Sequence, residues 1–140
     1  MTNKVLLGLL SIFVLTNCKD PKTNSNTVTK SDDFNIIINR VDTVGQEQEL
    51  FASFHISNKK YKLLHASVQC NINDTSTVDT LKGRIYNCHH SLIIENDSVK
   101  VWWATGKGTG KMSFEEVTLL AKGTDNKYYY QKCGFDYYVK

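Results

Sequence analysis

A two-residue alternation of apolar and polar side chains runs through this chain from Phe34 onward. Successive residues of a strand point to opposite faces of a sheet, so this spacing indicates strands that bury one face. The apolar positions of the clearest runs are Leu50, Ala52, Phe54 and Ile56; Leu64, Ala66, Val68 and Cys70; Val99, Val101 and Trp103; and Phe135, Tyr137 and Val139. The pattern therefore predicts a mainly β domain.

Turn signals separate these runs. Asn96-Asp97 stands between two β-rich segments and predicts a tight hairpin. Gly123–Asn126 predicts a second hairpin, which leads into the tyrosine-rich strand Tyr128–Gln131. Short strands at a spacing of roughly ten residues are typical of an antiparallel sandwich or a small barrel, and we expect one of these two architectures.

One segment, near 113–122, fits a short helix as well as a strand. Ser113 and Glu116 have the spacing of a capping box, and Gly123 stands where such a helix would end. The central Val117-Thr118-Leu119 suits a strand equally well, and we favour the strand.

The first residues have the organisation of an export signal. Lys4 precedes the unbroken apolar run Val5–Leu15, and polar residues follow immediately. The run has the length of a signal-peptide core and is too short to span a bilayer, which takes roughly 20 apolar residues. We therefore expect residues 1–17 to be a signal peptide and the mature protein to be exported to the cell envelope.

Cys18 makes this prediction more specific. Leu15-Thr16-Asn17-Cys18 resembles a lipobox, the site at which bacterial signal peptidase II cuts before a cysteine that carries a diacylglycerol. The common form has Ala or Gly where this chain has Asn17, and such relaxed lipoboxes resemble those of Bacteroidota-type lipoproteins. The resemblance implies a lipid anchor on Cys18, with the outer membrane as the expected location. An ordinary signal peptide and an uncleaved anchor are the alternatives.

The composition of the mature chain predicts its division into a tether and a domain, and its net charge. The segment 18–33 contains only one large apolar side chain besides Cys18, Val28, so we predict a flexible tether there and a single β-rich domain over 34–140. Removing the leader with Lys4 lowers the formal net charge from +3 to +2. Near-neutral charge without a basic stripe, together with export, argues against a nucleic-acid partner.

The cysteines remaining after lipidation are odd in number. Cys70, Cys88 and Cys133 would sit in a disulfide-permissive compartment, so we expect one disulfide and one free thiol. The pair Cys70–Cys88 is preferred, with Cys133 as an alternative partner of either. Three reduced thiols are the other alternative.

Two further motifs invite a chemical interpretation that their spacing does not support. Cys88-His89-His90 contains zinc-binding residue types, but adjacent strand residues face opposite ways, so we predict no metal site. Gly106–Lys111 lacks the spacing of a phosphate-binding P-loop and is interpreted as a flexible, basic loop. No catalytic motif and no requirement for a cofactor are found.

Trp102 and Trp103 are adjacent, so one side chain should face the core and the other the solvent. An exposed Trp suggests a contact site for a protein or a glycan. Lys100, Lys107 and Lys111 would give this site a basic rim, which favours an acidic partner surface or an anionic glycan.

Three functions follow from these features. The leading hypothesis is a membrane-anchored lipoprotein that presents a small non-catalytic binding domain to an envelope protein or glycan, and an inhibitor or immunity protein is one form of it. An envelope enzyme, such as a metal-assisted hydrolase using His89 or His90, is the second. A structural or assembly lipoprotein is the third.

Mass spectrometry of the mature N-terminus tests the export prediction. We expect a chain that begins at Cys18 and carries a diacylglycerol, because the apolar core ends at Leu15. An intact Met1, or an unmodified chain starting at any other residue, would contradict the prediction.

Overall fold

The computed structural model describes residues 25–114 and 116–140, without the side chains of Ser25 and His89. The predicted signal peptide and Cys18 lie outside the described residues. Every regular element in the described part is a strand, which confirms the prediction of a mainly β fold. Those residues contain no helix long and apolar enough to cross a membrane.

The strands in chain order are β1 (Ser25–Lys30), β2 (Ile36–Arg40), β3 (Thr43–Val44), β4 (Glu49–Ile56), β5 (Tyr61–Cys70), β6 (Thr77–Asp79), β7 (Arg84–Ile85), β8 (Cys88–Ser91), β9 (Ile93–Glu95), β10 (Ser98–Ala104), β11 (Gly110–Ser113), β12 (Val117–Gly123), β13 (Tyr128–Cys133) and β14 (Asp136–Val139).

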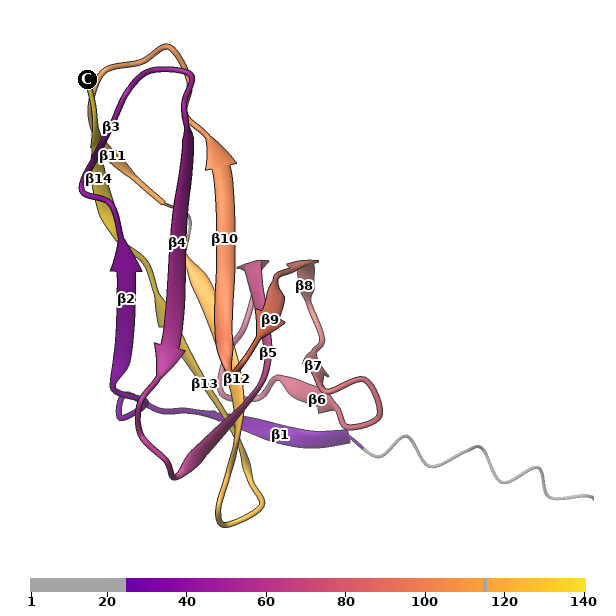
Figure 1. Cartoon of the computed structure of the whole chain (residues 1–140). Coiled ribbons are helices and arrows are strands. Elements are labelled where there is room, and N and C mark those ends of the chain that lie inside the picture. Colours follow the sequence, from indigo (N-terminus) through magenta and orange to yellow (C-terminus); the bar gives the residue numbers. More distant parts are fainter. Residues whose placement is uncertain (1–24, 115) are drawn as a thin grey trace, which may run out of the picture.

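These strands form three sheets. The largest has the order β7-β6-β1-β13-β12-β5-β8, the second is β2-β4-β10-β9, and the third is β11-β14-β3. Most neighbours are antiparallel, and the β1–β13 and β14–β3 pairs are parallel. The long strands β4 and β10 run side by side from the end that carries the C-terminus, while β1, β6 and β7 lie toward the opposite end (Figure 1). The sheets curl around shared cores, as the sandwich prediction requires.

Strand β12 contributes to two separate cores. Val117, Leu119 and Ala121 point into the main core, which lies between β5–β12 and β4–β10. Leu120 points the other way, into a smaller core that β1, β6, β7 and β13 cover. These four side chains are completely buried, and this burial on both faces makes β12 the centre of the fold.

The helical alternative near 113–122 is wrong. A strand can present Leu119 and Leu120 to opposite cores, because its successive side chains alternate between faces. It also pairs through backbone hydrogen bonds with β5 on one side and β13 on the other. Tertiary pairing therefore overrides the local capping pattern.

The alternation in β5 changes phase once. Leu120 pairs with His65 and Ala121 pairs with Leu63, so Leu64 is the extra residue of a β-bulge. As a result Leu63, rather than the predicted Leu64, packs in the main core.

The predicted tether also requires a correction. Ser25–Lys30 forms β1, which pairs with β6 and β13, so the folded domain begins no later than Ser25 instead of at Phe34. Val28, the one apolar side chain of this strand, is completely buried in the smaller core. Composition alone missed the strand because backbone bonds to two neighbouring strands hold it, and it carries a single apolar side chain.

The preferred disulfide forms. Cys70 and Cys88 are direct cross-strand partners on β5 and β8, with Cα atoms 4.2 Å apart. Cys133 is a free, half-buried thiol. Burial, followed by the charge of Glu116, raises the pKa of Cys133 to about 12, so the thiol stays protonated and unreactive at neutral pH.

The role of β1 can be tested with two substitutions in the same strand. We expect Val28→Ala to lower the free energy of unfolding by about 2 kcal/mol, because it leaves a cavity in the smaller core. Thr29→Ala, at an exposed position, should cost about 0.5 kcal/mol or less. Urea denaturation measures both values, and equal costs would show that β1 is not packed as described.

Candidate binding surface

The outer face of the β2-β4-β10-β9 sheet collects exposed apolar side chains. Phe51 and Trp102 are direct cross-strand partners, exposed by 53% and 60%. Ile37 pairs with His55 on β4, and Ile93 pairs with Lys100 on β10. Both partners point to the same side of the sheet as Phe51 and Trp102, so Ile37 and Ile93 lie on that face too, and each is 48% exposed. We call these four residues the Trp102 face.

The inner face of the same sheet explains why Trp102 points outward. Trp103 pairs with Leu50, a completely buried residue of the main core. Its ring lies 4.2 Å from that of Phe114 and 5.7 Å from those of Phe135 and Tyr137, measured between centroids. Trp103 Nε1 donates to the Tyr137 hydroxyl at 3.3 Å. One Trp therefore belongs to the core and its neighbour to the surface, as the adjacency predicts.

An open groove of about 500 Å³ adjoins the Trp102 face. Ile93 and Trp102 belong to both, so the apolar surface continues from the flat sheet into the groove. The remaining lining residues are Val68, Ser91, Leu92, Lys100, Val101, Trp103, Ser113, Phe114 and Tyr137. Most of this lining is apolar or aromatic, which is typical of a surface that buries a partner's apolar side chain.

The three lysines expected to form a basic rim each have an acidic neighbour. Lys100 forms an ion pair with Glu95, and Lys107 Nζ lies 3.8 Å from Glu47. Lys111 Nζ lies 2.7 Å from a carboxylate oxygen of Asp136, and this bond raises the pKa of Lys111.

Asp136 in turn accepts from Lys111 and Ser113, which lowers its pKa. All three lysines therefore have an acidic neighbour, and they do not form a rim of unpaired positive charge.

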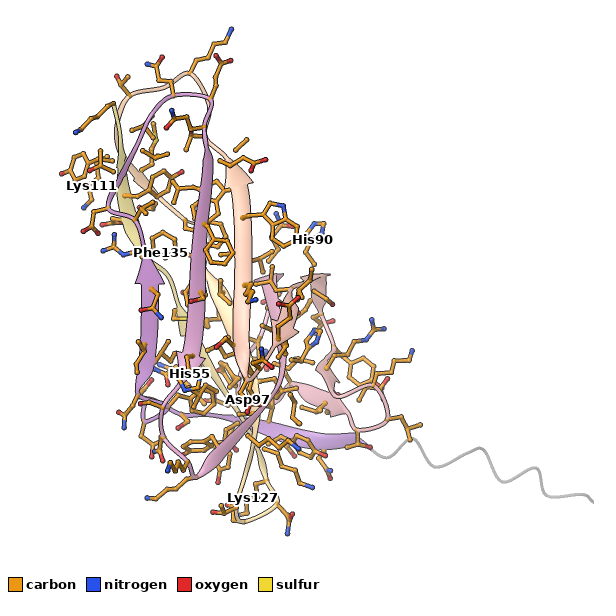
Figure 2. The ribbon with its side chains drawn as sticks, viewed as in Figure 1. His55, His90, Asp97, Lys111, Lys127 and Phe135 are labelled. Carbon is orange, nitrogen blue, oxygen red and sulfur yellow. A yellow bond between two sulfur atoms is a disulfide. The ribbon has the colours of Figure 1, made fainter. Side chains whose placement is uncertain are left out.

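The histidine side chains that the structure describes do not gather into a metal site. His90 is exposed on the edge strand β8, and Figure 2 shows it far from His55. The His89 side chain is not among those described. The described residues contain no group of three His, Cys, Asp or Glu side chains placed to hold a metal ion.

Sequence reasoning missed one polar cluster. His65 Nε2 lies 2.7 Å from Ser67 Oγ and 3.3 Å from Ser91 Oγ, across the β5–β8 pair. Burial, and then the charge of Arg84, lower the pKa of His65, so its ring is neutral at neutral pH. Only Ser91 is exposed, since Ser67 is buried. The register of β5 and β8 brings the cluster together, and a sequence pattern does not reveal that register.

In the described part of the chain, the His65 cluster lacks the carboxylate of a serine-hydrolase triad. No carboxylate among the described residues bonds to the His65 ring, so nothing orients the imidazole as a catalytic triad requires. Both hydroxyls approach the same ring nitrogen, which suits a structural link between β5 and β8.

Comparison with known proteins identifies no family. No protein-family model matches the chain, and no curated protein matches it. Among solved structures, it is similar to the sulfur carrier protein SoxY from Chlorobium limicola f thiosulfatophilum, with 11% sequence identity. The match covers 81% of this chain and 84% of the SoxY chain at a TM-score of 0.38, too low to support a functional argument.

Replacing each Trp by Ala tests their different environments. Trp103→Ala should lower the free energy of unfolding by about 3 kcal/mol, because it empties part of an aromatic cluster. Trp102→Ala should change it by less than about 1 kcal/mol, because the ring is mostly exposed. Thermal melting followed by far-UV circular dichroism checks both, and equal losses would place both rings in the core.

Proposed function

We propose that this protein is a cell-envelope lipoprotein, anchored in the outer membrane through Cys18, that presents a non-catalytic binding domain. One observation carries the proposal. Of the eight large apolar side chains exposed in the described residues, four form the Trp102 face. Ile93 and Trp102 adjoin the same groove, whereas Ile37 lies beside His55, four residues along β4 from Phe51. Exposed apolar residues gathered on one face of a folded domain usually mark an interaction site.

The composition of the face favours a protein partner over a glycan. Ile37 and Ile93 add aliphatic surface to the aromatic pair Phe51 and Trp102. An apolar face that also carries a paired charge, Lys100 with Glu95, resembles a protein–protein interface. Trp at the centre of such a face is the residue type that contributes most to binding.

The sheet that carries the face is held in place before a partner arrives. Its inner side packs on the main core, and on the opposing sheet the Cys70–Cys88 disulfide links β5 to β8. A rigid surface loses little conformational entropy on binding, which favours tight recognition. An inhibitor of a hydrolase, or an immunity protein, is a function that such a small rigid domain suits, by analogy alone.

Affinity capture from detergent extracts of the envelope tests the proposal. The acylated protein should retain one protein partner, and Trp102→Ala should weaken retention at least fivefold, corresponding to a loss of more than about 1 kcal/mol. Leu81→Ala is the matched control, because Leu81 is a large apolar residue that is 87% exposed outside the Trp102 face.

Equal retention by the two variants would contradict the assignment of the face. Retention that depends on Trp102 but is abolished by glycosidase treatment of the extract would identify a glycan partner instead. Absence of any Trp102-dependent partner would favour a structural or assembly lipoprotein.

A further inference from the structure

Five lysines gather at the end of the domain opposite the C-terminus. They come from the β4–β5 turn, from β5, from β12 and from the tip of the β12–β13 hairpin. We call them the lysine end: Lys59, Lys60, Lys62, Lys122 and Lys127. Four of them line one hollow of about 230 Å³, together with Gly123, Thr124 and Asn126. Figure 2 shows Lys127 at this end and Lys111 near the other.

The placement of two of these lysines is unfavourable for the isolated domain. Lys62 and Lys122 are direct cross-strand partners on β5 and β12, so their side chains leave the same face of the sheet. Like charges directly opposite each other destabilise a sheet. The Lys122 ammonium lies over the Tyr128 ring, 5.9 Å from its centroid, and this cation–π contact attracts the charge without neutralising it. A bound anion would relieve this repulsion.

The lysine end differs from the other lysines of the described chain. Lys30, Lys82, Lys100, Lys107, Lys111 and Lys132 each have a carboxylate within 4 Å, whereas among the described residues no ion pair forms at the five or at the C-terminal Lys140. Two carboxylates lie near enough for the charges of Lys60 and Lys127 to help lower their pKa, but neither forms an ion pair with a described lysine side chain. Asp33 accepts from Tyr61 and Ser31, and Asp125 accepts from Tyr129 and from the Lys127 backbone.

The chain also enters the fold at this end. β1 runs parallel to β13 with Val28 beside Tyr128, and Asn26 and Thr27 line a second hollow with Lys127. Figure 1 shows β1 crossing the molecule close to the β12–β13 hairpin. Cys18 precedes Ser25 by seven residues, which span at most about 25 Å. A bilayer that holds Cys18 therefore lies within reach of the lysine end.

We propose that the lysine end binds the phosphate groups of anionic lipid headgroups and so fixes the orientation of the domain on its membrane. This inference rests on the proposed lipid anchor at Cys18. Each lysine near an anionic surface contributes about a fivefold gain in association, and salt screens the effect within about 10 Å at 0.1 M. The acyl anchor and the lysines would both hold the protein on the membrane, because an acyl chain and a basic patch contribute separately to membrane binding.

Lysine footprinting on vesicles tests the orientation. The acylated chain is bound to vesicles of neutral phosphatidylcholine, or to vesicles in which one third is phosphatidylglycerol, and is acetylated briefly before mass spectrometry. On the anionic vesicles we expect acetylation of the lysine end to fall at least fivefold, and to recover in 1 M salt. Lys107, in the connection between β10 and β11, and the C-terminal Lys140 are the controls, because this connection and the C-terminus lie at the other end of the molecule (Figure 1).

A matched pair of variants sharpens the result. Lys62→Gln with Lys122→Gln should abolish the protection of Lys59 and Lys127, and should not lower the melting temperature, because it removes a like-charge pair. Lys107→Gln with Lys140→Gln should leave the protection unchanged.

Three outcomes would overturn the inference. The first is equal acetylation of the lysine end on the two vesicle types, and the second is protection of Lys107 as strong as that of the lysine end. The third is protection of the lysine end on neutral vesicles by 10 mM inorganic phosphate, which would assign the hollow to a free anion. Recovery of the protein with neutral vesicles reports the acyl anchor separately, so failure of the anchor and failure of the lysine end give different results.

Discussion

Burial of β12 on both faces is the constraint on which the rest of the structure depends. Leu119 belongs to the main core and Leu120 to the smaller one, so the strand needs a layer of protein on each side. The four-stranded sheet supplies one layer, and β1 with β6 and β7 supplies the other. Covering β12 in this way turns one face of the β2-β4-β10-β9 sheet inward, and its opposite face, with Trp102, is left toward solvent.

Patterns that depend on neighbouring residues could be predicted from the sequence. The alternation over 50–56 and 135–139 identifies the buried residues correctly, and Asn96 and Asp97 both adopt the positive φ that their hairpin requires. Features that depend on distant partners could not be predicted. β1 is a strand because of its backbone pairing with β6 and β13, and the bulge at Leu64 becomes visible only through the register with β12.

One part of the candidate site could likewise be predicted from the sequence, and another part could not. Adjacency alone places Trp102 and Trp103 on opposite faces, and the structure agrees. Phe51, Ile37 and Ile93 join Trp102 only through strand register, which the sequence does not state. The ion pair of Lys111 with Asp136 and the opposition of Lys62 with Lys122 depend on register too, so both charge patterns emerge only in the fold.

Our account gives the two regions separate roles, with the lysine end toward lipid and the Trp102 face toward a partner. Site-specific photocrosslinking in intact cells tests this division most directly. A photoreactive amino acid at Ser53, on the outer face of the same sheet as Phe51, should crosslink to one envelope protein, and the product should disappear in the Trp102→Ala background. The same probe at Leu81 should give no such product. Crosslinking of the same protein from both positions, or of lipid alone from Ser53, would contradict the account.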